Sequence, residues 1–422
     1  MSRLLIIGFI WLGCTVAWSI LGSSLTVRSA DTSSARSEEV HGLWGAPLHQ
    51  QPPQAFYTVE SIEKEIKTVR REGEEPVTTT IAHRVSRDID VPLEGSEMNA
   101  DFELMHRKRG LMWFATYGLD FHGTYAFRNA TEEARDVTMR LALETASRTY
   151  DGLRIVDDAG KSIPFAIIGG VAQWQQAFEP NQERRIEVSF RTRGTGSWTY
   201  SPVSGSDEAR NFRLRVTTDF PDVDFPVNSV SPSRHDASDG SCEWSFESLI
   251  TSSPIGIQMP EKLNPGPLAA RITFFAPVSL LFFFFVVSMV TITSGRELHP
   301  MHYFLLGCAF FAFHLLFAYS VDHLALTWAF VVSAGVSMLL VVTYVRLFVG
   351  WRFALRKVVP LQLIYLVLFS ASFFWKGFTG LAITVGAILT LFAVMQLTGR
   401  LDWTETFAKR AAERRPIGTE SL

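Results

Sequence analysis

The segment ITFFAPVSLLFFFFVVSMVTI, residues 272–292, decides the fold class of this chain. It carries no charged side chain, and about 20 apolar residues rising about 1.5 Å each cross the hydrocarbon core of a bilayer. Four further segments have the same character: residues 301–320, 324–345, 358–375 and 378–397. Because the connections between these five segments are short, residues 272–403 are predicted to form a five-helix transmembrane bundle.

Another apolar segment lies at residues 4–21, after Arg3. A cleaved signal peptide is the alternative, but its apolar region normally spans only about 7–15 residues. The candidate cleavage sequence VRSA, residues 27–30, also places Arg28 where a small residue is required. We therefore expect residues 1–27 to be a retained N-terminal transmembrane anchor, giving six spans, while cleavage stays open.

The composition excludes two classes of protein. The 422 residues are 47% hydrophobic and have a net charge of -3, which argues against a nucleic-acid-binding surface. Of the three cysteines, Cys14 and Cys308 lie inside apolar segments and Cys242 stands alone in the polar part. A lone cysteine builds no internal disulfide framework, so the polar part depends on its own hydrophobic core.

Basic residues predict the orientation. They gather between the fourth and fifth spans and after the sixth: Arg346, Arg352, Arg356, Lys357, Arg400, Lys409, Arg410, Arg414 and Arg415. Short cytoplasmic loops carry an excess of Lys and Arg. We therefore expect both termini to be cytoplasmic, with residues 404–422 as a cytoplasmic tail and residues 28–271 outside the cytoplasm.

The extracytoplasmic part divides in two. Residues 28–94 are predicted to be a tether and a poorly assigned segment, since residues 28–55 are rich in Ser, Pro and Gln. Within them, TVESIEKEIKTVRRE from Thr58 fits a short helix or an exposed strand. Residues 95–271 alternate between apolar and polar side chains in short runs separated by turn formers, which predicts a mainly antiparallel β domain, a sandwich or a barrel.

Three stretches resemble one family of bacterial inner-membrane proteins. They are HPMHYFLLGCAFFAFHLLFAYSVDHLALTWAF (299–330), TGRLDW (398–403) and HRKRGLMWFATYGLDFHGTYAF (106–127). In order and placement they are similar to motifs of the CreD family, over about residues 95–403. The chain departs from the family in residues 28–94 and in DFPDVDFPVNSVSP (219–232), where the family has a Trp-Pro-His-Pro stretch.

The resemblance implies a location and a role. It implies a multi-pass protein of the bacterial inner membrane, with a periplasmic domain, that contributes to cell-envelope integrity. It implies no catalytic reaction, so we expect a non-enzymatic protein that contacts the lipid bilayer and binds a lipid, an envelope component or a protein partner. A transporter or lipid-handling protein, and a receptor-like sensor signalling through a partner, stay open as alternatives. Ligand and oligomeric state stay undetermined.

Two membrane-interface motifs stand at the ends of the bundle. His299, Pro300, His302 and Tyr303 mark the start of the third span, where Pro suits a first helical turn and aromatic rings suit the headgroup region. Arg400, Asp402 and Trp403 mark the end of the last span. A metal or haem at the histidine pair lacks a further ligand at the same depth, so neither is expected.

Four residues are candidate functional residues: His314, Asp322, His323 and Gln362. His314 lies in the interior of a span, where ionisable groups are often functional, although a hydrogen bond to Gln362, Ser333 or a backbone carbonyl would explain it structurally. Asp322 and His323 lie at its outer end. The acidic loop 219–225 could attract Ca²⁺, but it lacks an EF-hand pattern. No cofactor, metal site or catalytic residue is predicted.

Overall fold

The computed structural model describes residues 2–399 apart from 70–76, 111, 146–147, 204–207, 222, 237, 295–297 and 376. Arg400, Asp402, Trp403 and the tail 404–422 therefore lie outside the described residues. The chain forms two compact units. The helical unit comprises Met1–Ser34 and Leu263–Leu422, and the β unit comprises Ala35–Lys262.

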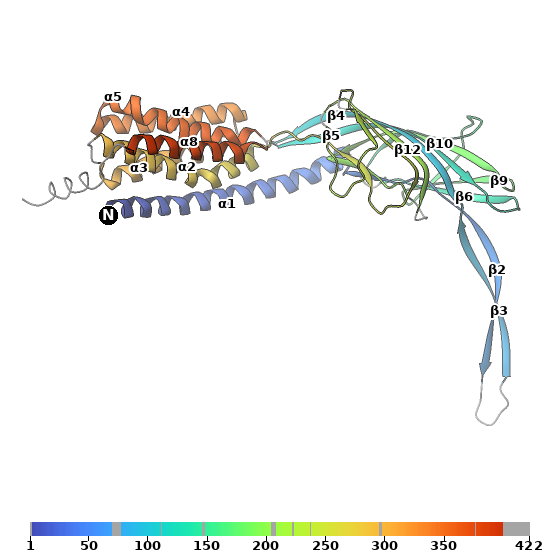
Figure 1. Cartoon of the computed structure of the whole chain (residues 1–422). Helices are drawn as coiled ribbons and strands as arrows, with labels where there is room; N and C mark the ends of the chain where they lie inside the picture. Colours follow the sequence, from blue (N-terminus) through green and yellow to red (C-terminus); the bar gives the residue numbers. More distant parts are fainter. Residues whose placement is uncertain are drawn as a thin grey trace, which may run out of the picture. The chain divides into compact units, whose positions relative to one another are not determined.

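Six helices of the described chain are long and apolar enough to cross a membrane, as the sequence predicts. They are α1 (Ser2–Trp44), α2 (Pro265–Thr293), α3 (Pro300–Ser320), α4 (Leu326–Val349), the composite helix Trp351–Phe374 and α8 (Thr379–Thr398). Helices α2, α3, α4 and α8 run side by side (Figure 1). Phenylalanine side chains fill the centre of the bundle; the rings of Phe283 and Phe310 lie 4.5 Å apart.

The composite helix starts earlier than the apolar pattern indicates. It consists of α5 (Trp351–Phe353), η1 (Ala354–Val358), α6 (Val359–Gln362), η2 (Leu363–Leu368), α7 (Phe369–Ala371) and η3 (Ser372–Phe374). The expected basic loop is therefore helical except at Gly350, whose φ of 91° makes the turn. Arg and Lys are good helix formers, which explains the extension. The π turns η1 and η2 flank Pro360, which cannot donate a backbone hydrogen bond.

The expectation of an irregular tether from residue 28 was wrong, because α1 continues to Trp44. Between Gly22 and Gly42 the sequence contains neither Gly nor Pro. An i,i+3 ion pair between Arg36 and Glu39, 2.9 Å apart, supports the extension. The helix ends at Gly45, whose φ of 88° terminates the helical conformation.

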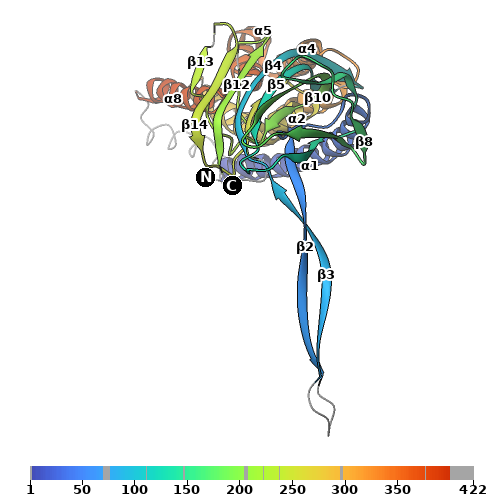
Figure 2. The same cartoon turned by 90° about the vertical axis from the view of Figure 1, so that its right-hand side faces the viewer.

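The β unit contains three sheets, as the alternating pattern predicts, and most strand pairs are antiparallel. A seven-stranded sheet has the order β13-β14-β12-β4-β5-β10-β7, a five-stranded sheet β3-β2-β6-β9-β8 and a three-stranded sheet β1-β11-β15 (Figure 2). The strands are β1 (Leu48–Gln50), β2 (Gln54–Val69), β3 (Val77–Asp90), β4 (Leu93–Arg109), β5 (Met112–Arg128), β6 (Arg135–Ala142), β7 (Tyr150–Asp157), β8 (Ala166–Ile168), β9 (Val171–Phe178), β10 (Glu183–Thr195), β11 (Ser197–Tyr200), β12 (Ala209–Thr218), β13 (Arg234–Asp236), β14 (Ser241–Leu249) and β15 (Ile255–Gln258).

The core of the β unit follows from strand alternation. Along β4 and β5, every second side chain is buried, as at Phe102 and Phe121, while Asp101 and Asp120 face outward. The inward side chains of all three sheets join into one hydrophobic core containing Trp174, Trp198 and Trp244. The outward face of the seven-stranded sheet is left to polar and charged residues.

The segment from Thr58 is a strand, not a helix. It forms most of β2, which pairs with β3 from Phe56 to Val69 but with β6 only at Gln54–Phe56. Beyond that point β2 and β3 form an isolated two-stranded ribbon (Figures 1 and 2). Cross-strand ion pairs connect its two strands, including Arg87 with Glu63 at 2.6 Å.

Candidate functional site

The predicted histidine pair lies at the start of α3. His299 is the N-cap, and its Nδ1 accepts a hydrogen bond from the Met301 backbone N–H at 3.2 Å, while Pro300 occupies the first turn. His302 stacks on Phe348 with ring centroids 4.0 Å apart and hydrogen-bonds the Tyr344 hydroxyl at 2.7 Å. Both histidines therefore have structural partners on α3 or α4.

Tyr303 is buried one residue further along α3. Its hydroxyl accepts a hydrogen bond from Ser288 on α2 at 3.0 Å, and its ring meets the edge of Phe284. Among the described residues no group of three His, Cys, Asp or Glu side chains is arranged to hold a metal ion. The geometry at this end of α3 is that of helix capping and interhelical packing.

His314 of α3 is almost completely buried, and its ring contacts Trp18 of α1. Its Nδ1 lies 2.9 Å from the Phe310 carbonyl oxygen; because a carbonyl only accepts, Nδ1 carries the proton and Nε2 presents a lone pair. Within the described chain, His314 Nε2 has no hydrogen-bond partner, and neither has the indole N–H of Trp18. The two rings meet edge to face with centroids 5.6 Å apart.

Gln362 lies in a separate hydrogen-bond chain. Its side-chain amide donates to Ser337 at 3.1 Å, and Ser337 donates to the Ala309 carbonyl at 2.7 Å. The Gln362 Oε1 atom has no partner among the described residues. No hydrogen bond joins His314 to Gln362 or to Ser333 in the described chain, so the backbone carbonyl is the one expected partner that His314 contacts.

Asp322 receives an ion pair that the sequence does not reveal. Arg28 of α1 places Nη2 3.1 Å from the Asp322 carboxylate and 3.1 Å from the Ala318 carbonyl, and its guanidinium covers the Tyr319 ring. The neighbouring His323 is exposed, and its backbone N–H bonds Ser320 at the end of α3. Asp322 therefore helps to hold α1 against the end of α3.

Sequence reasoning missed a large cavity in the β unit, a cleft of about 1110 Å³. Its floor is the outward face of the seven-stranded sheet. Its walls are the last turn of α1 and the connection between β6 and β7. The cleft is lined by His41, Trp44, Asp101, Glu103, Gly118, Asp120, Thr145, Arg148, Asp151, Arg191 and Arg193, among others.

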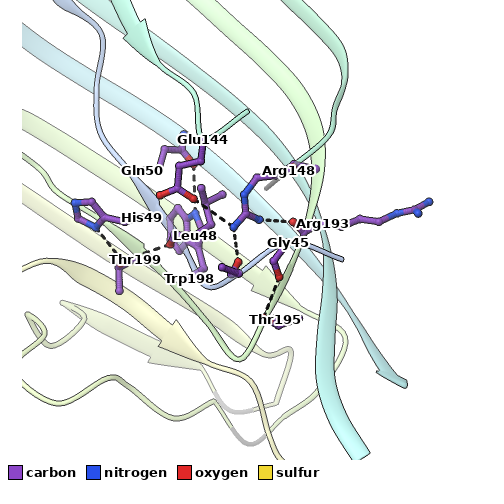
Figure 3. Close-up of polar contacts among 12 residues, drawn as sticks. Gly45, Leu48, His49, Gln50, Glu144, Arg148, Arg193, Thr195, Trp198 and Thr199 are labelled. Atoms are coloured by element: carbon purple, nitrogen blue, oxygen red, sulfur yellow. Dashed lines mark hydrogen bonds and ion pairs between the residues drawn. The ribbon is translucent and has the colours of Figure 1, made fainter. Parts of the chain in front are cut away.

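Arg148 holds the walls of the cleft together (Figure 3). Its side chain is fully buried, and its guanidinium donates hydrogen bonds to the carbonyls of Arg193 and Ala46. It also lies 3.4 Å from the Glu144 carboxylate. One buried cation thus joins β10, the chain after α1 and the β6–β7 connection.

Two glycines make room for this cation. A Cβ on Gly194 would lie 2.9 Å from Arg148 Nη1, and a Cβ on Gly45 would lie 3.1 Å from the same atom. Beneath it, the Tyr117 hydroxyl donates to the Ser197 carbonyl at 3.1 Å. Burial raises the pKa of Tyr117, and the nearby Arg148 cation opposes that shift, so Tyr117 remains a neutral donor.

Trp44 covers one side of the cleft. Its ring lies under two guanidinium groups, with Arg107 of β4 4.4 Å and Arg193 of β10 5.1 Å from the ring centroid. Between these strands, β5 contributes Gly118, directly opposite both Glu103 and Arg193. The missing side chain at Gly118 leaves the floor of the cleft open.

The acidic loop 219–225 has a structural use. The Asp219 carboxylate accepts a hydrogen bond from the Leu104 N–H at 2.9 Å, and the Asp224 carboxylate accepts one from the Phe225 N–H at 2.8 Å. Asp222 lies outside the described residues. The Asp219 carboxylate fixes the loop against β4, and the Asp224 contact lies within the loop itself.

Six apolar helices and a separate β-rich unit define a multi-pass membrane protein with a large polar domain. The family resemblance is confirmed for the C-terminal part: residues 243–404 match the CreD family, described as inner membrane protein CreD. The protein is accordingly a multi-pass inner-membrane protein. The stretch at 106–127, which also resembles the family, lies outside the matched residues.

The comparison with curated proteins finds no match. Solved structures show weak similarity. A proposed nutrient-binding protein from Legionella pneumophila is 11% identical, with 46% of this chain and 74% of that chain covered and a TM-score of 0.30. Two structures of an M1 zinc metallopeptidase from Deinococcus radiodurans are 13% and 11% identical, covering 39% and 76% of this chain and 42% and 94% of theirs, with TM-scores of 0.21 and 0.25. Scores this low carry no argument about fold or function.

Proposed function

We propose that this inner-membrane protein contributes to cell-envelope integrity by binding an envelope component in the cleft of its β unit. The observation that carries the proposal is the cleft itself, about 1110 Å³ and lined by charged residues around Trp44. Ligand sites are typically concave and place a few oriented polar groups beside an aromatic side chain. The walls are preorganised, because buried Arg148 joins them.

The proposal includes an orientation, with both termini in the cytoplasm and the β unit in the periplasm. Its support is the charge of the short connections. Arg346, Arg352, Arg356 and Lys357 cluster where α4 meets the composite helix, while the turn between α3 and α4 carries only Asp322 and His323. The positive-inside rule places the basic cluster in the cytoplasm.

Binding rather than catalysis is proposed for the cleft. Among the lining residues that the structure describes there is no serine or cysteine. The hydroxyl of Thr192 already donates to the Thr149 carbonyl at 2.8 Å. Charged side chains of both signs around an aromatic ring suit recognition of a polar ligand.

A cleft-filling variant tests the function. Gly118→Phe places an aromatic ring in the open floor and leaves every charged residue in place. The matched control is Thr124→Phe, on the outward face of the same strand but outside the cleft. Cells lacking the protein should become sensitive to detergent and other envelope stress.

Wild type and Thr124→Phe should restore resistance, whereas Gly118→Phe should not, with equal amounts of each protein in the membrane. Full restoration by Gly118→Phe would show that the cleft is not required.

A transporter is the second candidate, favoured by the unpartnered polar atoms inside the bundle. His314 Nε2 and Gln362 Oε1 are buried without hydrogen-bond partners among the described residues. Such atoms at membrane depth are costly unless water or a substrate reaches them. Against this reading, α2, α3, α4, the composite helix and α8 contain no Asp or Glu in their described residues.

A further inference from the structure

On the floor of the cleft, acidic side chains lie on β4 and β5 and basic side chains lie on the neighbouring strand β10. In one row across the seven-stranded sheet, Asp101 of β4 lies directly opposite Asp120 of β5. Like charges directly opposite each other destabilise a strand pair. Glu103 lies two residues along β4 on the same outward face, and neither Asp101 nor Glu103 forms an ion pair in the described chain. Three carboxylates therefore gather on the β4–β5 side.

The neighbouring strand carries the opposite charge. Arg191 of β10 lies opposite Asp120, and Arg193 lies opposite Gly118. Arg191 forms an ion pair with Asp151 of β7, the next strand of the sheet, at 3.4 Å. The Arg193 guanidinium makes a cation–π contact with the Trp44 ring. One strand spacing, about 4.8 Å, separates the acidic side from the basic side.

A second observation is a buried cation in the wall on the basic side of the cleft. Arg148 lines the cleft with a fully buried side chain, and its Nε atom has no hydrogen-bond partner among the described residues. That Nε atom is closed off from solvent, so the contribution of Arg148 to the cleft is its fixed positive charge, which adds to those of Arg191 and Arg193 on the basic side. Arg148 lies in the same wall as Asp151, next to the basic strand.

We propose that the cleft binds a zwitterionic amine, a molecule carrying an ammonium group and a phosphate or carboxylate about 5 Å away. The ammonium lies on Asp101, Asp120 and Glu103 and relieves their repulsion. The anion lies on Arg191 and Arg193. This inference rests on the proposed function and names its ligand class. The same chemistry occurs in a phosphatidylethanolamine headgroup and in a soluble short peptide.

The binding test uses the full chain, purified in detergent, and isothermal titration with O-phosphoethanolamine, ethanolamine and inorganic phosphate. O-phosphoethanolamine should bind one to one, and each half-molecule at least tenfold more weakly. Asp101→Asn combined with Asp120→Asn should weaken O-phosphoethanolamine at least tenfold while leaving phosphate unchanged. Glu97→Gln, on the outward face of β4 but outside the cleft, is the control and should bind normally.

Two further arms identify the source. For the first, a photo-crosslinking probe is placed at Thr145 and the protein is inserted into nanodiscs. If a lipid headgroup is the ligand, the probe should crosslink to phosphatidylethanolamine in nanodiscs of that lipid and should give no crosslink in nanodiscs of phosphatidylglycerol. Competition by the dipeptide alanyl-alanine, without any lipid crosslink, identifies a soluble ligand instead. Either result supports the zwitterion.

Equal binding of phosphate and O-phosphoethanolamine, normal binding by the double Asn variant, or no binding at all would overturn the inference. These failures are separable from failure of the proposed function. If Gly118→Phe still fails in cells while no zwitterion binds, the cleft has a different ligand. If zwitterions bind and Gly118→Phe restores resistance, the ligand class holds and the envelope role does not.

Discussion

Replacing Arg148 by Met is expected to destabilise the β unit more than any exposed substitution on the same sheets. The side chain is fully buried, and it donates hydrogen bonds to the Arg193 and Ala46 carbonyls. Met keeps most of the packing volume but donates nothing. Both carbonyls are then left without this donor, while Glu144 is partly exposed and can be hydrated.

The magnitude follows from these contacts. A buried polar group left unpaired costs about 1–3 kcal/mol, so two carbonyls cost about 2–6 kcal/mol. Removing a buried cation also removes its desolvation penalty, which offsets part of that cost. We expect a loss of about 3 kcal/mol in the free energy of unfolding. In a unit of this size each kcal/mol lowers Tm by about 2–4 °C, so Tm should fall by about 6–12 °C.

The assay is thermal unfolding of the full chain in detergent, followed by near-ultraviolet circular dichroism. Arg185→Met is the matched control, because Arg185 is mostly exposed and lies 3.7 Å from Glu183. An exposed pair contributes about 0–1 kcal/mol, so the control should shift Tm little. Equal Tm values for Arg148→Met and Arg185→Met would refute the assignment of Arg148 as the residue that joins the cleft walls.

Three further predictions concern the cysteines and the bundle. An ideal Cβ at Gly307 lies 3.1 Å from the Cys14 sulfur, so a cysteine introduced by Gly307→Cys should form a disulfide with Cys14 under mild oxidation. Peptide mass spectrometry detects this disulfide, and a mature protein that lacks the first span could not form it. His314→Asn should keep both stability and envelope phenotype, and His314→Leu should lower stability by about 1 kcal/mol; normal Tm with lost function in both variants would favour the transporter. Burial raises the pKa of the Cys242 thiol to about 11, and the nearby Asp239 carboxylate acts in the same direction. Cys242 in the native protein at pH 7 should therefore react with maleimide only after unfolding, and rapid labelling of Cys242 in the native protein would contradict this.

The spans and the strand class were predictable because both rest on local periodicity. Apolar length alone identifies α2, α3, α4 and α8, and alternation identifies β4 and β5. The extension of α1 was not predicted, because a Ser-rich composition was read as irregular chain although no helix breaker intervenes. Packing against α2 and α3, through Trp11 and Arg28, supplies what the local sequence does not show.

The cleft could not be predicted, because it depends on cross-strand register. Asp101, Asp120 and Arg191 are far apart in sequence and become neighbours only through the pairing of β4, β5 and β10. The alternating RTRG stretch at 191–194 and the Trp44-Gly45 helix end were visible signals, but neither indicates a cavity alone. The ion pair of Asp322 with Arg28 could not be predicted either, because residues 28–94 were expected to form a tether rather than to continue α1.

The side of the membrane on which the β unit lies tests the central claim most directly. Ala159 is exposed in the turn after β7, and Ala159→Cys offers a small label site there, while Thr419→Cys marks the C-terminal tail. With a membrane-impermeant maleimide on intact spheroplasts, and Cys14, Cys242 and Cys308 replaced by Ser, the proposal predicts that Ala159→Cys is labelled and Thr419→Cys is labelled only after lysis. Labelling of Thr419→Cys in intact spheroplasts, with Ala159→Cys protected, would place the β unit in the cytoplasm and contradict the proposed role in the envelope.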